Sequence, residues 1–307
     1  MAKESQIKAP NDFKILIVYP NLPLMLTPSL AVGLFTSIFK KKGYQVQLFE
    51  TTHYSSEEQA SPLNRVKNLN VRPFDVKKDL GKVLSQGHMF EDFRELVLEY
   101  QPDVLIFSLV EDPLPQAIEL LRVVEDLKIP HLVGGVFPST APDICMEMPE
   151  INLIGLGEGE RTVATVAEAV RTGQSLAGIP GTWFKKHDGE IIKTRPGPLV
   201  NINDVLPDFS LFDRNRFSRP IGGRVFMAMP VETYRGCPYS CTYCNSPAQR
   251  VFSKENDLGV FLRRKKMSVL RDELAQYLEL YDPEFCFFID DSFLARPRQE
   301  IFDFCDM

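Results

Sequence analysis

Short runs of β-branched and other apolar residues alternate with longer amphipathic stretches through the first 175 residues of the chain. Alternation at this spacing predicts a parallel sheet with helices on both faces. The predicted strands cover 13–20, 44–50, 103–109, 131–135 and 152–157, and the predicted helices cover about 28–42, 88–100, 114–128, 139–147 and 160–172. Because no G-x-G-x-x-G follows the first strand, the sequence favours the flavodoxin-like strand order 2-1-3-4-5 over a Rossmann order.

Four loops of this predicted sheet fall at one edge, because each follows the carboxyl end of a strand. They supply small residues and backbone N–H groups, and they comprise residues 20–29, 108–113, 134–142 and 155–160. Taken one at a time, the Gly-Gly and Gly-Glu-Gly-Glu stretches are equally well explained as turns and helix caps. Four such loops on one edge favour a binding site for a large polar ligand.

The length of 307 residues favours more than one domain. We expect an α/β domain over 11–175, a β-hairpin with an extended linker over 176–222, and a second domain over 223–307. The hairpin is predicted to turn at Asp188-Gly189, and the second domain to begin with a strand near Arg224. The polar stretch 51–85 lacks periodicity, so it is expected to be an irregular insertion.

Charge and hydropathy exclude several classes of partner. The net charge is −6 and no basic field dominates, so we expect no nucleic-acid partner. No apolar run approaches the roughly 18 residues that a membrane span needs, and the N-terminal MAKESQIKAPND lacks the apolar stretch of a signal peptide. We therefore expect a cytoplasmic protein, in which clustered cysteines serve metal or redox chemistry rather than disulfides.

Three cysteines stand close together in RGCPYSCTYC at 235–244, and one loop can present Cys237, Cys241 and Cys244 to one metal centre. Zinc is one candidate, but a structural zinc site needs a closed set of four ligands. The nearest later cysteine, Cys286, lies in a distant apolar run, and no histidine follows the three cysteines. A [4Fe–4S] cluster held by three cysteines, with one iron open to another ligand, is the alternative that the spacing favours.

This stretch resembles the signature of the radical S-adenosylmethionine (SAM) enzymes, C-x3-C-x2-C with an aromatic residue before the last cysteine. The resemblance implies that the three cysteines bind a [4Fe–4S] cluster whose open iron chelates the amino and carboxylate groups of SAM. It also implies that Tyr243 packs against the adenine, and that reductive cleavage of SAM gives a 5′-deoxyadenosyl radical. A flavodoxin- or ferredoxin-type electron donor is implied in the same way.

A pair of carboxylates forms a second feature of the same region. FCFFIDDSFL at 285–294 predicts a buried strand that follows a helix at about 268–280 and ends in Asp290 and Asp291. In a β/α barrel the chemistry takes place at the carboxyl ends of the strands, so both side chains are expected to face the cluster. The family resemblance implies that such a pair binds the SAM ammonium group. The alternative is that Asp291-Ser292 caps the next helix.

The first half of the chain resembles the cobalamin (B12)-binding domain that precedes the barrel in one large class of radical SAM enzymes. PSLAVGLFTSIFKKKGYQVQLFE, QPDVLIFSLVEDP, HLVGGVFPSTAPD and LIGLGEGERT carry this resemblance. It implies that the four loops cradle cobalamin, with contacts from Pro20, Asn21, Ser108, Gly134, Gly135, Gly157 and Glu158. Loop 20–29 lacks the D-x-H-x-x-G histidine of related domains, so cobalamin is expected to bind without a histidine below the cobalt. A domain that has kept its fold and lost its cofactor is the alternative.

The second half is expected to be the start of a partial (β/α)6 radical SAM barrel. Only 71 residues run from Cys237 to Met307, enough for two barrel strands. We therefore expect the chain to be a truncated, N-terminal part of a longer enzyme, and expect most residues that choose the substrate to lie outside it.

The function that these resemblances imply is cobalamin-dependent methylation of an unactivated carbon, on a small-molecule or peptide substrate. No catalytic residue is assigned beyond the cofactor contacts. One alternative is a radical SAM cyclase or other oxidative enzyme with a vestigial cobalamin domain, and another is a non-catalytic corrinoid-binding fragment. A methylthiotransferase is disfavoured because only Cys145 precedes the cysteine motif.

Overall fold

The computed structural model describes residues 7–23, 25–54, 88–222 and 224–307. Its larger sheet has seven strands in the order β2-β1-β3-β4-β5-β6-β7. The first five are parallel and comprise β1 (Lys14–Tyr19), β2 (Gln45–Glu50), β3 (Val104–Ser108), β4 (His131–Gly134) and β5 (Leu153–Gly155). The predicted order 2-1-3-4-5 and the α/β fold class are confirmed. Most of the predicted insertion at 51–85 lies outside the described residues.

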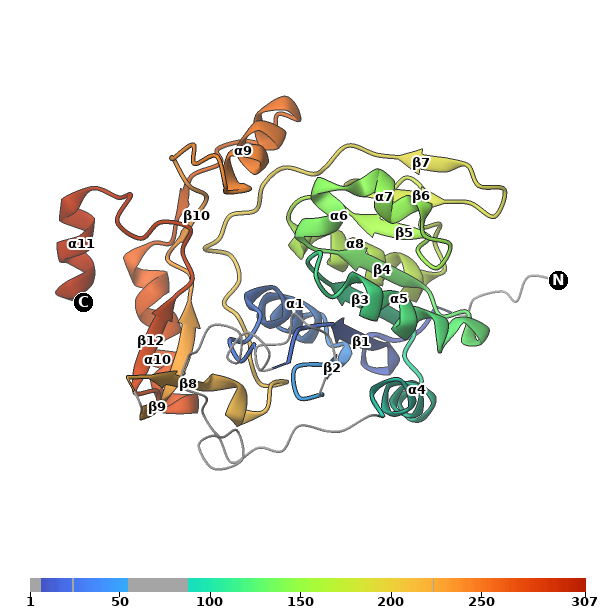
Figure 1. Cartoon of the computed structure of the whole chain (residues 1–307), viewed down its shortest axis with the longest axis horizontal. Coiled ribbons are helices and arrows are strands. Elements are labelled where there is room, and N and C mark those ends of the chain that lie inside the picture. The colour runs from blue at the N-terminus through green and yellow to red at the C-terminus, as the bar shows by residue number, and fades with distance from the viewer. Residues whose placement is uncertain (1–6, 24, 55–87, 223) are drawn as a thin grey trace, which may run out of the picture.

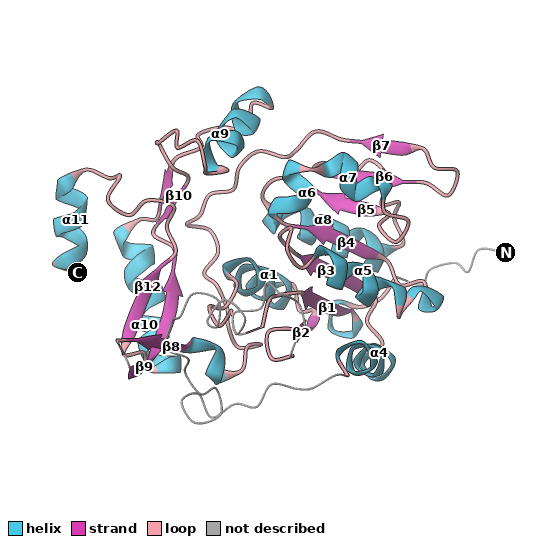
Figure 2. Cartoon of the chain, viewed as in Figure 1, coloured by secondary structure: helices cyan, strands magenta, loops and turns pink. Residues whose placement is uncertain are grey.

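Helices cover both faces of this sheet (Figure 2). Alternate residues of β1 point to opposite faces, as in any strand, so Ile15 and Ile17 pack with one set of helices and Leu16 and Val18 with the other. The first set is α1 (Leu30–Lys41) and α8 (Gly159–Thr172), and the second is α4 (Met89–Tyr100), α5 (Leu114–Arg122) and α7 (Pro142–Glu147). Short 3-10 helices η1 (Pro10–Asp12) and η2 (Glu125–Leu127) complete this part.

The helix predicted at about 139–147 is confirmed only in part, because the structure has two short helices there. They are α6 (Val136–Thr140) and α7, and Ala141 between them has φ −134° and ψ 54°. A residue that precedes proline is disfavoured in the helical conformation, so Pro142 interrupts a continuous helix at Ala141. The first of the two helices thus begins directly after the Gly134-Gly135 turn.

The predicted hairpin is present and extends the larger sheet. Strands β6 (Thr182–Lys185) and β7 (Ile191–Lys193) are antiparallel, and β6 also pairs antiparallel with β5. Gly189 in the turn has φ +87°, a left-handed conformation that glycine adopts without strain. The domain limits at 175 and 222 stay a prediction, although the sheet itself runs through to β7.

A smaller three-stranded sheet follows, in the order β12-β9-β8 (Figure 1). Its strands are β8 (Ser218–Ile221), β9 (Arg224–Val231) and β12 (Phe285–Phe288), and β9 and β12 are parallel, as expected for two successive barrel strands. The expectation that β12 is buried is wrong: Phe285 is 42% exposed and the rest of the strand is half-buried. The cause is its position at the edge of the described sheet.

The remaining elements surround this smaller sheet. They are η3 (Arg214–Phe217), β10 (Tyr234–Arg235), α9 (Ser246–Glu255), β11 (Arg263–Arg264), α10 (Met267–Tyr281) and α11 (Arg298–Cys305). Because α11 begins only at Arg298, Asp291-Ser292 does not cap it. Helix α11 lies on the side of the smaller sheet that faces away from the larger sheet (Figure 1). None of the helices in the described part of the chain could span a membrane.

The linker between the sheets packs closely on α1. A Cβ atom added to Gly33 of α1 would lie 2.8 Å from Cε1 of Phe209 and 3.0 Å from Cβ of Pro207. The Phe209 side chain is fully buried, and the backbone N–H of Asp208 donates to the Gly33 carbonyl at 2.9 Å. Glycine at position 33 therefore lets the linker lie directly against the helix.

We expect Gly33→Ala to lower the free energy of unfolding, as measured by urea denaturation. Overpacking a rigid core costs about 1–3 kcal/mol, and the higher helix propensity of alanine returns at most about 1 kcal/mol. Gly197→Ala is the matched control, because nothing lies within 4 Å of its added Cβ. A Gly33→Ala variant as stable as the control would contradict the close packing.

Candidate functional site

A cavity of about 530 Å³ lies where the carboxyl ends of β3, β4 and β5 face the second half of the chain. Five of the seven residues predicted to contact cobalamin line it, namely Ser108, Gly134, Gly135, Gly157 and Glu158. Its inner wall is largely apolar and comes from Leu30, Leu34 and Phe35 of α1, Leu132 of β4 and Val163 of α8. Three of the four predicted loops therefore meet at one site.

The fourth predicted loop is directed elsewhere, so Pro20 and Asn21 do not line this cavity. The backbone N–H of Asn21 donates to Oγ1 of Thr51 at 2.7 Å, and its Nδ2 donates to Oγ1 of Thr52 at 3.0 Å. These bonds tie the loop after β1 to the residues that follow β2. Long-range hydrogen bonds of this kind leave no periodic signal in the sequence.

The rim of the cavity is held by its own hydrogen bonds. Oγ of Ser139 accepts from the backbone N–H of Gly157 at 2.9 Å and donates to the carbonyl of Gly135 at 2.9 Å. Gly135 has φ +119°, and an added Cβ there would lie 2.1 Å from the carbonyl oxygen of Leu109. The Gly134-Gly135 turn is thus required by the fold and also shapes the rim.

Helix α9 forms the opposite wall of the cavity, which the sequence did not indicate. Its residues Ala248, Gln249, Phe252 and Ser253 line the cavity. The same helix also holds the cysteine loop, since Arg250 donates to the Pro238 carbonyl at 2.6 Å and to Oγ of Ser240 at 2.7 Å. One short helix therefore contacts both the cavity and the loop that carries the cysteines.

The three cysteines lie on the loop between β10 and α9. Cys237 is buried, whereas Cys241 and Cys244 are exposed, and all six cysteines of the chain are free. The Sγ atom of Cys244 accepts the backbone N–H of Ser246, the first residue of α9, at 3.4 Å. Hydrogen bonds to cysteine sulfurs are among the interactions that tune iron–sulfur clusters.

The three thiols do not surround a common point in this structure. Among the described residues, no three His, Cys, Asp or Glu side chains are arranged to hold one metal ion. In a [4Fe–4S] cluster each cysteine binds a different iron, so its thiolates lie farther apart than the ligands of zinc. The assignment of the three cysteines to such a cluster stays a prediction.

The two predicted carboxylates occupy different environments. Asp290 is fully buried, and its Oδ1 accepts the backbone N–H groups of Thr233 at 2.6 Å and Tyr234 at 3.0 Å. Its Oδ2 lies 3.0 Å from Nη2 of Arg296, which is also buried. These bonds occupy both carboxylate oxygens, so Asp290 ties β12 to the β9–β10 connection rather than facing the cavity.

Asp291, by contrast, lines the cavity and is exposed to solvent. Partial burial and the nearby charges of Glu232 and Asp290 raise the pKa of Asp291, against the opposing effects of a backbone hydrogen bond from Gly236 and of Arg235. Of the pair, Asp291 is the one placed to meet a ligand. Tyr243 is 90% exposed, and a hydrogen bond with Cys241 raises its pKa. Its contact with adenine stays a prediction.

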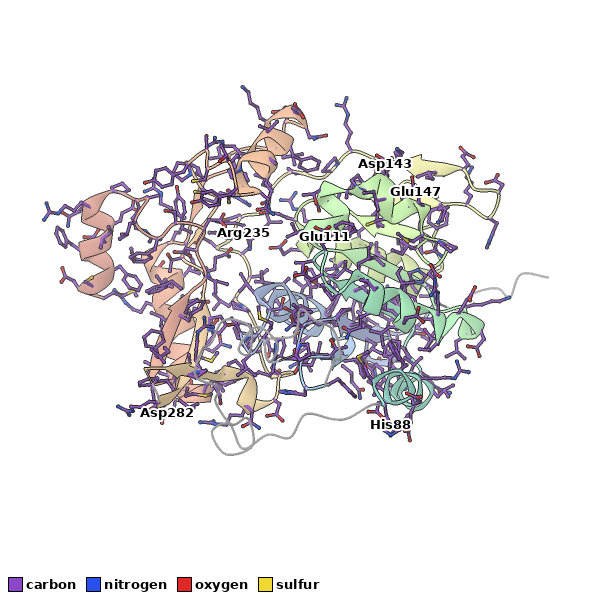
Figure 3. All side chains as sticks on the ribbon, in the orientation of Figure 1. His88, Glu111, Asp143, Glu147, Arg235 and Asp282 are labelled. Atoms are coloured by element: carbon purple, nitrogen blue, oxygen red, sulfur yellow. The ribbon has the colours of Figure 1, made fainter. Side chains whose placement is uncertain are left out.

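Charged side chains from both halves meet at the edge of the cavity, and sequence reasoning missed all of them except Glu158. Arg235 lies between the two sheets (Figure 3) and pairs with Glu158, Glu160 and Glu232. Burial opposes ionisation of Glu158, but hydrogen bonds and charges from Arg263 and Arg235 lower its pKa. The position of Arg235 two residues before Cys237 was the available signal.

None of the described residues that line the cavity is a histidine. His53 lies beside Glu50, with 3.9 Å between Nε2 and Oε1, and His131 is at the start of β4, the end opposite the cavity. Burial lowers the pKa of His131. His88 precedes α4 (Figure 3), away from the cavity. The residues present therefore offer no imidazole to a bound cobalt at this site.

No family model matches the chain, but known proteins are similar to it in sequence or in fold. An uncharacterized methyltransferase of Pyrococcus horikoshii is 24% identical over 226 residues, which are 71% of this chain and 46% of that protein. The anaerobic magnesium-protoporphyrin IX monomethyl ester cyclase of Synechocystis sp. is 36% identical over 122 residues, which are 38% of this chain and 24% of that one.

The solved structure of OxsB, a cobalamin-dependent SAM radical enzyme with aqua-cobalamin and SAM bound, aligns with a TM-score of 0.65 at 19% identity. The alignment covers 96% of this chain and 37% of OxsB, so the chain spans less than half the length of each of these three proteins. The fold is that of the cobalamin-dependent radical SAM enzymes, and the resemblance to this class is confirmed.

The two carboxylates are expected to differ in their effect on stability. Asp290→Asn leaves the buried Arg296 guanidinium without its counter-charge, and breaking a buried ion pair costs about 3–5 kcal/mol. Asp291→Asn changes an exposed side chain, so the free energy of unfolding is expected to change by no more than about 0.5 kcal/mol. Thermal or urea unfolding of both variants checks this, and equal effects of the two substitutions would refute the assignment.

Proposed function

We propose that this chain is part of a radical SAM enzyme that methylates an unactivated carbon with the help of cobalamin. In this proposal Cys237, Cys241 and Cys244 hold a [4Fe–4S] cluster, Asp291 binds the SAM ammonium group, and the cavity holds part of the corrinoid. The observation that carries it is the double role of α9. This helix lines the cavity on one side and holds the cysteine loop on the other. Two cofactors bound at these places would be neighbours.

The cavity suits a ligand with both apolar and polar parts. Its inner end is formed by Leu34, Phe35 and Val163, whereas its rim offers Ser108 and the glycines that follow β4 and β5. Ligand sites of this kind are mostly apolar, with a few placed polar groups that fix orientation. A corrinoid bound here would receive no histidine from the lining residues, in keeping with the sequence of loop 20–29.

The chain's own residues would bind and orient the cofactors. The cluster and SAM supply hydrogen abstraction from a carbon, and cobalamin supplies the methyl group. Arg250 fixes the cysteine loop through the Pro238 carbonyl and Ser240, while Phe252 and Phe261 add apolar surface to the lining of the cavity. Asp291 offers a carboxylate to a cationic group, and Tyr243 an exposed ring to adenine. A flavodoxin- or ferredoxin-type donor and a cytoplasmic location belong to the same proposal.

A second candidate is oxidative ring formation. The 36% sequence identity to the anaerobic magnesium-protoporphyrin IX monomethyl ester cyclase over 122 residues favours it. The two candidates share the cluster and SAM sites and differ in what cobalamin does. Detection of methylated rather than ring-closed product from the full-length enzyme would distinguish them.

Anaerobic reconstitution with iron and sulfide tests the cluster assignment. We expect the broad visible absorbance of thiolate-bound iron in the unaltered chain and its loss when Cys237, Cys241 and Cys244 are all changed to alanine. Cys305→Ala is the matched control, since Cys305 is an exposed cysteine on α11, outside the loop. Absorbance that survives the triple change would show that the loop does not hold the cluster.

Gly159→Ala is expected to weaken cobalamin binding. An added Cβ at Gly159, the first residue of α8, would lie 2.7 Å from Cζ of Phe35, which lines the cavity. The Phe35 ring, which itself lines the cavity, must then shift, and a cost of about 1.4 kcal/mol to the bound state corresponds to a tenfold rise in Kd. Equilibrium dialysis with hydroxocobalamin measures the change, with Gly197→Ala as the control; an unchanged Kd would place the ligand elsewhere.

A further inference from the structure

An ionic network joins the rim of the cavity to the segment that carries the cysteines. Nη1 of Arg235 lies 3.1 Å from Glu158 and 2.8 Å from Glu160, both in the loop after β5 or the first turn of α8. The same guanidinium makes a two-point contact with Glu232, at 2.7 Å from Nε and 3.0 Å from Nη2. Arg235 therefore holds carboxylates from both halves of the chain at once.

A second arginine supports this contact from the neighbouring strand. β10 and β11 are antiparallel, and Arg235 is directly opposite Arg263 in their register. Arg263 donates to Glu158 at 2.5 and 2.7 Å and to the Val200 carbonyl at 2.7 Å. Glu158 is thereby held by two guanidinium groups, so a ligand that moves its carboxylate removes one contact of Arg235.

A single, tightly packed residue joins Arg235 to the cysteine loop. Gly236 separates Arg235 from Cys237 and has φ +93°. An added Cβ at Gly236 would lie 2.6 Å from the Phe261 carbonyl oxygen, and the Gly236 backbone also hydrogen-bonds Asp291. Because Gly236 is packed on both sides, its backbone has little room to absorb a movement of its neighbour.

The network is partly buried, which makes its geometry specific. The exposed fractions of the side chains are 19% for Arg235, 17% for Glu158 and 12% for Glu160. Ion pairs at such sites are screened less than surface pairs, and the planar fork of arginine fixes direction in a way that lysine does not. Asp291, which also lines the cavity, is a further charged group near Arg235.

We propose that Arg235 is a positioning residue that couples occupancy of the cavity to the geometry of the cysteine loop. The proposal rests on the proposed function, because it takes the two cofactors to be a corrinoid and a [4Fe–4S] cluster. Coupling between two sites is reciprocal for binding. A cluster on the cysteine loop therefore changes the affinity of the cavity for the corrinoid, and the corrinoid changes the surroundings of the cluster by the same linkage.

The test compares the Kd of hydroxocobalamin for the cluster-free chain and the reconstituted chain by anaerobic equilibrium dialysis. We expect the two values to differ by about fivefold or more in the unaltered protein. In Arg235→Ala the ratio of the two Kd values is expected to fall to about one. In Arg235→Lys it is expected to lie between that of Arg235→Ala and that of the unaltered protein. The Mössbauer spectrum of the cluster, which reports iron alone, is expected to respond to hydroxocobalamin in the unaltered protein and not in Arg235→Ala.

Arg271→Ala is the matched control, because Arg271 is exposed on α10 and does not line the cavity. Glu160→Gln removes one contact of Arg235 without touching the cysteine segment, so it tests the same link if Arg235→Ala fails to fold; its ratio is expected to fall as well.

Each outcome decides the matter. A ratio of one in the unaltered protein overturns the coupling while leaving the proposed function intact. If the role of Arg235 were merely structural, its replacement would weaken corrinoid binding equally with and without the cluster. An unchanged ratio of the two Kd values in the Arg235 variants therefore overturns the role assigned to it. Failure of the unaltered chain to bind a corrinoid or a cluster overturns the proposed function itself, and the coupling with it.

Discussion

One apolar core joins the two sheets, and the Phe209 ring lies within it. Its centroid is 6.2 Å from Phe212, 6.1 Å from Phe217 and 6.0 Å from Tyr277, so residues of the linker and of α10 meet on a single ring. The same core contains the β1 residues that pack under α1 and the β9 residues Met229 and Val231. The position of the smaller sheet, and with it the facing wall of the cavity, depends on this packing.

Buried ion pairs restrict how the two sheets pack, because apolar contacts alone do not specify one orientation. Such pairs contribute little net stability but cost several kcal/mol when broken, so their main effect is to specify one arrangement. Three of them lie along or near the junction: Arg216 with Glu50, Lys265 with Glu273, and Arg296 with Asp290. The first links the linker to β2, and the others fix α10 and β12 around the strand that leads to the cysteines.

Local pattern was enough to predict the sheet and most of one wall of the cavity, but not the opposite wall. Strand order followed from alternation, because each strand and helix leaves its own periodicity. The direction of Asn21, by contrast, depends on hydrogen bonds to Thr51 and Thr52, which follow another strand. The different roles of Asp290 and Asp291 depend on the directions in which their side chains point after the end of β12. The cysteine spacing predicted a site because its geometry is local to one loop.

The wall that α9 contributes shows why the second half of a site is hard to read from sequence. The apolar residues of α9 face a cavity whose other wall lies about 100 residues earlier, in the loops after β4 and β5. Nothing in the helix itself distinguishes this from packing against a core. The position of α9 in the chain gives it two contacts. It begins two residues after Cys244, so the helix that lines the cavity also ends the cysteine loop. The short connection from Cys244 to α9 therefore keeps the two proposed cofactor sites close together, and the ion pairs of Arg235 and Arg263 with Glu158 hold the two walls of the cavity against each other.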